Sequence, residues 1–254
     1  MKIAISGKGG VGKSTVAAAL ALTLANQGQR VLALDADPDA NLASALGMSD
    51  KLQDGIIPIS RQTGLIEERT GVLNEYGKVF KLNPEVSDVA EKLSTPINGV
   101  NLIVLGAVKT GGGGCACPES TFIRALVNDL VLYKNETLIM DMEAGIEHLG
   151  RATACGVDVM LVVVEPGKRS IDCANTVIRM AGEIGVKRLL FIGNKITSAE
   201  DEEYIRASLP NSEFAAMIPY LPSVRNADRD GVSVVDTADA EFTKRISSIL
   251  ESLE

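Results

Sequence analysis

Residues 7–15, with the sequence GKGGVGKST, combine glycines, lysines and hydroxyl groups at a spacing that suits phosphate chemistry. The apolar run at 2–6 predicts a strand before them, and the alanine- and leucine-rich run at 16–26 predicts a helix after them. In that setting glycines let successive backbone N–H groups point into one concavity at the helix N-terminus, where an anion binds. The alternative, a plain glycine turn, does not require Lys13 and Ser14 at these positions. The segment is therefore predicted to be a phosphate-binding loop.

Three side chains of this loop have different predicted tasks. Lys13 is expected to reach the β- and γ-phosphates of a nucleoside triphosphate, and the Ser14 hydroxyl is expected to bind Mg²⁺. Lys8 is a second lysine inside the loop, on the γ-phosphate side. Burying that cation is costly unless a phosphate neutralises it, either in the same subunit or in a neighbouring one.

A group of aspartates follows the second predicted strand, residues 29–35. Carboxylates at the C-terminal ends of parallel strands face the ligand crevice of an open α/β sheet. We expect Asp35 or Asp37 to hold Mg²⁺ through water, and one of them to position the attacking water. The alternative is a helix-capping role, which we expect for Asp39 at the start of a helix over 40–46.

Cys115 and Cys117 are the second feature with predicted chemistry, because two thiols one residue apart can bind the same soft metal ion. A helix is predicted over 118–134, and its N-terminus favours the thiolate form. Two ligands do not complete a tetrahedral thiolate site, but a two-fold dimer would supply four, and the glycines at 111–114 permit close approach. Two reduced structural thiols or a redox disulfide are the alternatives.

Composition limits the class of protein. The chain has 254 residues, 46% of them hydrophobic and 23% charged, as in a globular protein with a full core. The net charge of −8 argues against a nucleic-acid partner, since phosphate backbones require a basic face. No apolar run is long enough to span a bilayer, and we expect no signal peptide because the sequence begins with a predicted strand. Four cysteines without a disulfide-like framework indicate the cytoplasm.

The predicted fold is α/β, a doubly wound and mainly parallel sheet of seven or eight strands with helices on both faces. Residues 1–254 are expected to form one domain, with an insertion of irregular and short helical structure at about 50–100. Insertions of this length are commonly lids or contact surfaces, so we assign this one to partner contact or dimer closure.

The loop sequence GKGGVGKST resembles the deviant Walker A motif of P-loop NTPases in the MinD, ParA, ArsA and nitrogenase iron-protein class. That resemblance implies a homodimer with Lys8 acting on the partner's nucleotide. It also implies that Asp37 orients the attacking water and that Asp141, ending the strand at 136–141, holds Mg²⁺ through water. Gly145 would swing its N–H group onto the γ-phosphate, coupling nucleotide state to the segment after the strand.

The same resemblance locates the nucleotide base. Asn194 lies where this class reads the base through a side-chain amide, and Pro219 and Tyr220 would flank it. Thr197 stands where a guanine-specific protein has an aspartate, so adenine is favoured. The residues assigned to nucleotide are Gly9, Gly10, Val11, Gly12, Lys13, Ser14, Thr15, Asp35, Asp141, Gly145, Asn194, Lys195, Pro219 and Tyr220, and those assigned to catalysis are Lys8, Lys13 and Asp37.

Residues 113–119 and 141–151 narrow the resemblance to the CooC-type nickel-insertion ATPases that mature carbon monoxide dehydrogenase, or a sister group serving acetyl-CoA synthase. This implies ATP, Mg²⁺ and a homodimer that binds Ni²⁺, or Zn²⁺, through Cys115 and Cys117, with an apo-enzyme as client. His148 is assigned to a helix surface or to packing rather than to metal. The rival functions are a positioning ATPase that binds DNA or membrane and an iron–sulfur carrier ATPase.

Overall fold

The computed structural model describes residues 1–71, 81–107, 118–132, 136–143, 156–236 and 239–253. Its centre is one eight-stranded sheet in the order β3-β4-β2-β5-β1-β6-β7-β8. All neighbouring pairs run parallel except β3 with β4, which is antiparallel at the sheet edge. The strands are β1 (Lys2–Ser6), β2 (Val31–Asp35), β3 (Thr95–Ile97), β4 (Val100–Val104), β5 (Thr137–Asp141), β6 (Val159–Val164), β7 (Leu189–Ile196) and β8 (Phe214–Pro219). The predicted fold class is confirmed.

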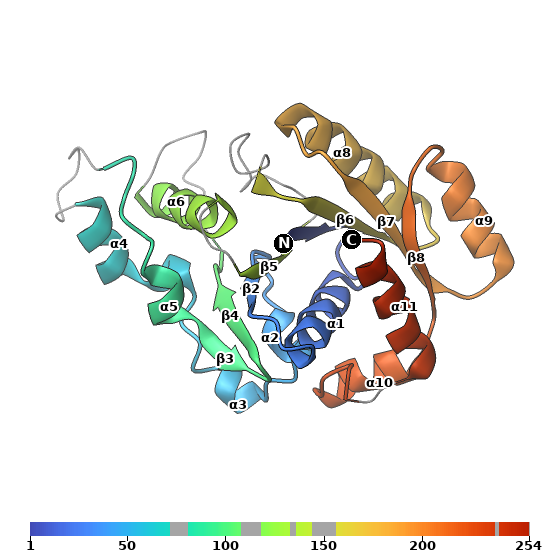
Figure 1. The fold of residues 1–254 in the computed structure, drawn as a ribbon, viewed down its shortest axis with the longest axis horizontal. Coiled ribbons are helices and arrows are strands. Elements are labelled where there is room, and N and C mark those ends of the chain that lie inside the picture. The colour runs from blue at the N-terminus through green and yellow to red at the C-terminus, as the bar shows by residue number, and fades with distance from the viewer. Residues whose placement is uncertain (72–80, 108–117, 133–135, 144–155, 237–238, 254) are drawn as a thin grey trace.

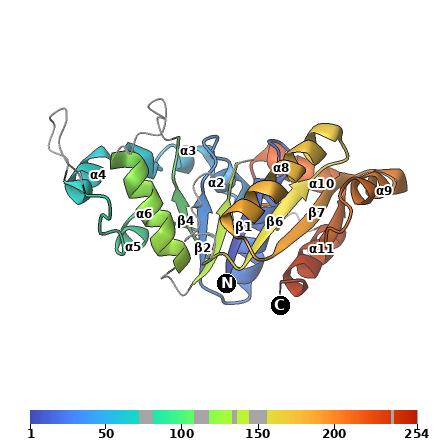
Figure 2. The same ribbon diagram turned by 90° about the horizontal axis from the view of Figure 1, so that it is seen from above.

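Helices cover both faces of the sheet (Figures 1 and 2). One apolar layer lies under α1, α2, α10 and α11, and the other lies under α4, α5, α6, α8 and α9. The helices are α1 (Lys13–Asn26), α2 (Leu42–Ala45), α3 (Asp50–Gln53), η1 (Ile59–Arg61, a 3₁₀ turn), α4 (Thr63–Thr70), α5 (Val89–Leu93), α6 (Pro118–Leu132), α8 (Lys168–Ile184), α9 (Ala199–Ser208), α10 (Pro222–Asp230) and α11 (Ala240–Glu251). None of the helices in the described ranges is long and apolar enough to cross a membrane.

Strand β1 shows why the sheet is buried on both sides. Ile3 and Ile5 belong to the apolar layer with α1, whereas Ala4 between them belongs to the layer with α6 and α8. Side chains alternate across a strand, so a strand covered on both faces must be apolar throughout. The continuous apolar runs in the sequence are explained by this burial.

The carboxyl ends of the central strands bring the polar residues of the sequence together. In the parallel register, Asp35 at the end of β2 is the partner of Asp141 at the end of β5, and Ile5 of β1 also pairs with Asp141. The loop at residues 7–12 leaves β1 at this same edge and leads into α1. The topology therefore places both aspartates beside the start of α1.

The predicted helix cap is wrong. Asp39 does not cap α2, whose N-cap is Asn41 and whose Leu42 N–H donates to Asp35 Oδ2 at 2.9 Å. The buried carboxylate of Asp35, rather than the exposed side chain of Asp39, therefore satisfies the backbone at the start of this helix.

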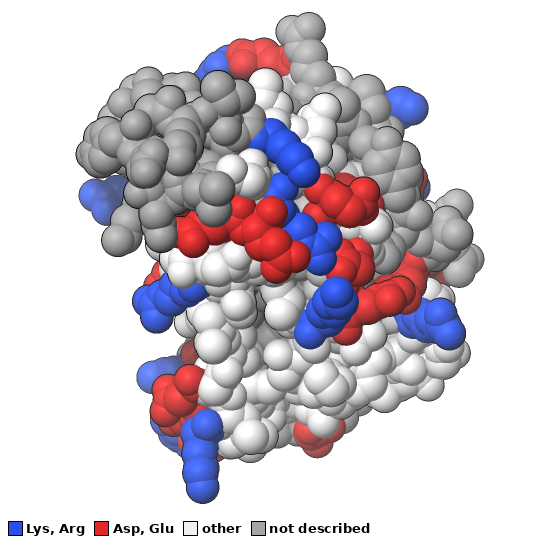
Figure 3. Space-filling model, turned by 90° about the vertical axis from the view of Figure 1, so that its left-hand side faces the viewer, with Lys and Arg blue, Asp and Glu red and all other residues white. Residues whose placement is uncertain are grey.

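The segment at about 50–100 holds the short helices α3, η1, α4 and α5 together with β3. The Arg69 guanidinium of α4 donates two hydrogen bonds, of 3.0 and 2.8 Å, to the carboxylate of Asp88, just before α5. On this side of the molecule acidic and basic side chains stand next to each other rather than forming a patch of one sign (Figure 3). Ion pairing thus ties the two short helices together.

Strand β3 was not predicted, although its turn carries a sequence signal. Asn98 and Gly99 separate β3 from β4 and have φ values of 46° and 84°, as a two-residue type I′ hairpin requires. An Asn-Gly pair between short apolar runs is the usual sequence mark of such a hairpin. The strand escapes prediction because it has only three residues, one of them Pro96.

Candidate active site

The loop at residues 7–12 adopts a conformation that only glycine tolerates at two points. Gly7 has a φ of 148° and Gly12 a φ of 99°, both in the region that L-residues avoid. A Cβ atom on Gly7 would collide with the carbonyl oxygen of Val163, and one on Gly12 would collide with the side-chain amide of Asn194. The glycines are therefore required by backbone shape and by close contact with β6 and β7.

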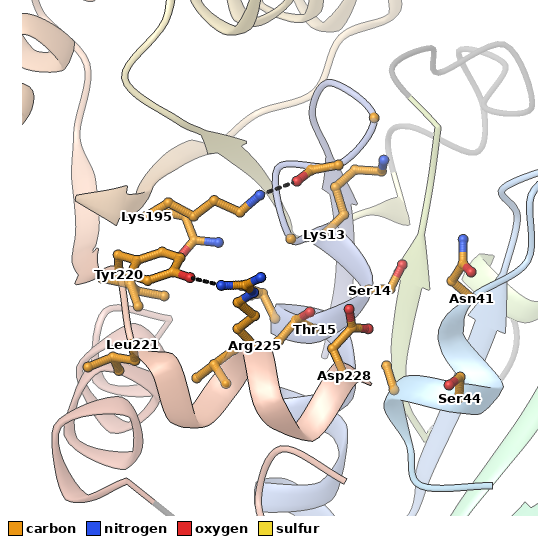
Figure 4. Close-up of a pocket in the computed structure, with 18 of the residues that line it drawn as sticks. Lys13, Ser14, Thr15, Asn41, Ser44, Lys195, Tyr220, Leu221, Arg225 and Asp228 are labelled. Atoms are coloured by element: carbon orange, nitrogen blue, oxygen red, sulfur yellow. Dashed lines mark hydrogen bonds between the residues drawn. The ribbon is translucent and has the colours of Figure 1, made fainter. Parts of the chain in front are cut away.

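A cavity of about 710 Å³ opens over this loop at the carboxyl edge of the sheet (Figure 4). One wall is the loop and the start of α1, and another is the start of α10 with Tyr220 and Leu221. The predicted nucleotide residues that line it are Gly9, Gly10, Gly12, Lys13, Ser14, Thr15, Asn194, Lys195, Pro219 and Tyr220, and the predicted catalytic residue Asp37 lines it too. The structure thus brings most of the predicted site to one cavity.

Other predicted residues lie elsewhere. Val11 is fully buried, and Asp35 and Asp141 are buried at the strand ends without lining the cavity. Gly145, Cys115 and Cys117 lie outside the described residues, as does His148. Within the described ranges, no group of three or more His, Cys, Asp or Glu side chains is arranged to hold a metal ion.

Lys13 is an almost buried cation at the start of α1. Its side chain is 5% exposed, and its Nζ lies 3.5 Å from Oδ2 of Asp37. A buried ammonium group requires a nearby negative charge, and Asp37 supplies one here. The phosphates of a nucleotide would supply more charge at the same place, so Lys13 is placed to exchange a carboxylate partner for phosphate.

Asp35 and Asp141, which end β2 and β5, are carboxyl groups whose charged form is disfavoured by burial. Burial raises the pKa of Asp35 to about 7, with the charge of Asp141 adding to the effect and hydrogen bonds from the Leu42 and Asp37 N–H groups opposing it. Burial likewise raises the pKa of Asp141 to about 6, against the opposing influence of Ser14 and Lys13. Two adjacent buried carboxyl groups favour the protonated form when no cation is present.

Asp141 fits a Mg²⁺ site. Both of its carboxylate oxygens are buried and neither accepts a hydrogen bond of ordinary geometry from a described residue. Unpartnered buried carboxylate oxygens are costly, and a hard divalent cation is the ligand that would satisfy them. Asp141 and Ser14 would hold the ion, directly or through water, and the ion would neutralise charge on the phosphates.

Two side chains of β7 hold the phosphate loop through hydrogen bonds to its backbone carbonyls. The Asn194 side-chain amide donates to the Val11 carbonyl at 2.7 Å, and Lys195 Nζ donates to the Gly10 carbonyl at 2.6 Å (Figure 4). Lys195 has a φ of 59°, a left-handed conformation that is uncommon for a non-glycine residue. Asn194, expected to read the base, thus also fixes the backbone of the phosphate loop.

Glu165 is not among the predicted site residues, although it lies at the loop. Its Oε1 is 3.3 Å from Lys8 Nζ and its Oε2 is 3.7 Å from Lys195 Nζ. The available signal was its position: it directly follows β6, at the sheet edge where Asp35 and Asp141 also end their strands. Lys8, in contrast, does not line the cavity in the described part of the chain.

The far end of the cavity has a mixed wall suited to a flat heterocycle and a sugar. The Arg225 guanidinium donates to the Tyr220 hydroxyl at 3.4 Å, while Asp228 of α10 lies across from Asn41, just before α2, and from Ser44 of α2 (Figure 4). Tyr220 is 41% exposed, so its ring is accessible to a ligand. The cavity therefore joins an anion-binding loop to an aromatic and hydrogen-bonding wall, as a nucleotide requires.

The fold and the site define a P-loop ATPase with a second lysine in its phosphate loop. The family described as CobQ/CobB/MinD/ParA nucleotide binding domain matches residues 2–234, and the chain belongs to this family. The solved MinD of Pyrococcus horikoshii in complex with Mg-ADP has a TM-score of 0.68 at 21% identity, covering 100% of this chain and 96% of that chain. A plasmid partition protein of Borrelia burgdorferi bound to AMPPNP has a TM-score of 0.69 at 16% identity, covering 98% and 97%.

More similar relatives confirm the narrower resemblance. The carbon monoxide dehydrogenase accessory protein CooC of Rhodospirillum rubrum is 42% identical over 240 residues, covering 94% of this chain and 91% of that protein. An uncharacterized ATP-binding protein of Methanocaldococcus jannaschii is 39% identical over 253 residues, covering 98% of this chain and 96% of its own. The similarity therefore extends over the whole domain rather than over the phosphate loop alone.

Replacing Gly12 by alanine is expected to weaken nucleotide binding at least about tenfold, since both the backbone conformation and the Asn194 amide exclude a Cβ atom. Titration calorimetry with Mg-ADP measures the affinity. Gly28→Ala is the matched control, because Gly28 has a φ of 84° but no atom within 4 Å of the added Cβ. Equal affinity of the two variants would contradict the assigned role of Gly12.

Replacing Asp141 by asparagine is expected to stabilise the nucleotide- and Mg²⁺-free protein at pH 8 by about 1–3 kcal/mol while abolishing ATP hydrolysis. The folded-state pKa of Asp141 is raised to about 6, so the stability linked to its proton is present at low pH and is lost as the pH rises through 6. The difference between the two proteins should therefore shrink as the pH falls below 6 and vanish only below about pH 4, where the carboxyl group is protonated in the unfolded chain as well, as measured by urea unfolding in EDTA.

The control for this pH dependence is Asp172→Asn. Asp172 is a carboxylate of α8 that is 59% exposed and paired with Lys168 at 3.6 Å, so its loss should leave the pH profile of unfolding unchanged. A constant difference between wild type and Asp141→Asn from pH 4 to pH 8 would show that Asp141 does not carry a raised pKa.

Proposed function

We propose that this ATPase is a nickel-insertion accessory protein, which uses ATP binding and hydrolysis to load nickel into carbon monoxide dehydrogenase or acetyl-CoA synthase. The observation that carries the proposal is the 42% identity, over 94% of the chain, to a protein named as a carbon monoxide dehydrogenase accessory protein. The Cys115-Ala116-Cys117 sequence adds a soft-metal ligand pair that a plain positioning ATPase does not need.

The ATPase half of the proposal rests on the described cavity. Gly9 to Thr15 would bind the phosphates, Lys13 would contact the β- and γ-phosphates, and Asp37 would orient the attacking water. The position of Asp37 supports this role. Asp37 lines the cavity, and its Oδ2 lies 3.5 Å from Lys13 Nζ, which would contact the γ-phosphate. Hydrolysis of this kind depends on positioning and charge neutralisation rather than on covalent chemistry by the protein.

The dimer in the proposal rests on Lys8. In the single chain its ammonium group is paired with Glu165, and its side chain is 37% exposed. A lysine of the phosphate loop that does not line its own cavity is available to a phosphate outside the subunit. We therefore propose that two copies close face to face on ATP, with each Lys8 contacting the nucleotide of the other.

Nickel is the cargo, and Cys115 and Cys117 are its proposed ligands. They precede the first residue of α6, Pro118, by three residues and one residue. One pair from each subunit would provide four thiolates, a set that binds Ni²⁺ and also Zn²⁺. Closure on ATP would bring the pairs together, and hydrolysis would separate them and release the metal to the cytoplasmic client.

Two other functions remain as outcomes of the tests. A MinD- or ParA-like positioning ATPase shares the fold but would bind DNA or membrane and would not need the cysteines. An iron–sulfur carrier ATPase would use the same thiolates for a cluster, and its optical spectrum after anaerobic purification would show absorption that a nickel or zinc thiolate site with no cluster lacks.

The test is nickel stoichiometry of the metal-free protein, measured with and without Mg²⁺ and the slowly hydrolysed analogue ATPγS, alongside its molar mass in solution. We expect about one Ni²⁺ per dimer in wild type and none in Cys115→Ser or Cys117→Ser, because two remaining thiolates do not complete the site. Cys173→Ser is the matched control, since Cys173 is a half-buried thiol on α8.

Retention of nickel by both Cys115→Ser and Cys117→Ser would remove these residues from the metal site. Dimer formation on ATPγS without cysteine-dependent metal would leave the ATPase intact and overturn nickel delivery. Absorption typical of a cluster in the wild type would instead favour the iron–sulfur carrier.

A further inference from the structure

Glu165 sits at the junction of β6 and α8, where its backbone is held firmly. It directly follows β6, and its N–H group donates at 3.0 Å to the hydroxyl of Ser170, which is 2% exposed. The side chain is 27% exposed, so the carboxylate is partly shielded from water. A partly buried carboxylate on a fixed backbone makes stronger ion pairs than one at a free surface.

The carboxylate bridges two lysines of the phosphate-loop region. Oε1 accepts a hydrogen bond from Lys8 Nζ at 3.3 Å, and Oε2 lies 3.7 Å from Lys195 Nζ. Lys195 is anchored by its own hydrogen bond of 2.6 Å to the Gly10 carbonyl. Lys8 has no such second anchor among the described residues, so the position of its ammonium group depends on Glu165.

We propose that Glu165 is a positioning residue that holds Lys8 within its own subunit until ATP-dependent dimerisation draws the lysine to the partner's phosphates. This inference rests on the proposed dimer. The carboxylate and the partner's phosphate compete for one ammonium group, and a phosphate chain carries more negative charge than one carboxylate. Glu165 thereby sets the nucleotide concentration at which the dimer forms and opposes closure without ATP.

The geometry separates this role from that of the other carboxylate at the loop. Asp37 lines the cavity beside Lys13, whereas neither Glu165 nor Lys8 is among the described residues that line it. Phosphate bound in the same subunit therefore replaces Asp37 at Lys13 directly. Only a phosphate presented from outside the cavity competes with Glu165 for Lys8, and the second copy of this chain brings one.

The first measurement is the ATPγS concentration that gives half-maximal dimer, determined by analytical ultracentrifugation of the full-length, nickel-free protein with Mg²⁺. Glu165→Gln is expected to lower this concentration about two- to fivefold, the range that a half-exposed ion pair contributes. Glu165→Asp, which keeps the charge, is expected to return toward the wild-type value. Glu183→Gln is the control, since Glu183 pairs with Arg179 at 2.8 Å elsewhere on α8.

The second measurement detects the Lys8–Glu165 contact directly. A zero-length carbodiimide activates a carboxylate, which the amine of a contacting lysine then attacks to form an amide while the activating group leaves as a urea. Mass spectrometry should find the Lys8–Glu165 amide in the nucleotide-free monomer and lose it in the ATPγS dimer. The Lys195–Glu165 amide is the internal control, because Lys195 stays bound to Gly10 in the same subunit.

The outcomes distinguish this inference from the proposed function. If wild type dimerises on ATPγS but Glu165→Gln leaves the midpoint unchanged or raises it, Glu165 does not restrain Lys8. Persistence of the Lys8–Glu165 amide within one isotopically labelled subunit of the dimer also overturns the restraint. If wild type stays monomeric at every ATPγS concentration, the dimer itself is wrong, whatever the cross-linking of the monomer shows.

Discussion

Lysine ammonium groups held close to the phosphate loop require negative charges nearby, and this constraint governs the arrangement of the whole carboxyl edge of the sheet. In the absence of nucleotide, Asp37 balances Lys13 at 3.5 Å, and Glu165 balances both Lys8 and Lys195. Each carboxylate follows a parallel strand, so the doubly wound topology places it beside the loop. Nucleotide phosphates and carboxylates are thus alternative partners for the same cations.

The same edge of the sheet holds two further carboxyl groups, beyond those that pair with its lysines. Asp35 and Asp141 are buried as neighbours in the register of β2 and β5, and burial raises the pKa of each carboxyl group. The two carboxylates differ in their hydrogen-bond partners. Asp35 accepts hydrogen bonds from the N–H groups of Asp37, in the loop before α2, and of Leu42, the first residue of α2, whereas the oxygens of Asp141 lack such partners among described residues. Asp35 is therefore suited to holding the loop before α2, and Asp141 is suited to binding a cation.

The phosphate loop, the strand-end aspartates and the fold were predictable because each depends on local pattern or on the parallel-sheet rule. Glu165 was not, because its role comes from a strand distant in sequence, and a single glutamate after an apolar run carries no motif. Asp39 was wrongly predicted to cap α2 because Asp35, seven residues before Leu42, reaches the helix start through the tertiary fold. The third strand was missed despite its Asn98-Gly99 turn, because three residues give little periodicity.

The hydrogen bonds from β7 side chains to the carbonyls of the phosphate loop have a consequence for the orientation of its peptide units. A planar trans peptide directs its carbonyl and the next N–H in opposite directions. With the Gly10 and Val11 carbonyls held by Lys195 and Asn194, the N–H groups of Val11 and Gly12 point away from these two side chains, and the Val11 N–H donates to the Lys8 carbonyl at 3.4 Å. The orientation of these peptide units is therefore fixed partly by two side chains of β7 before any nucleotide binds.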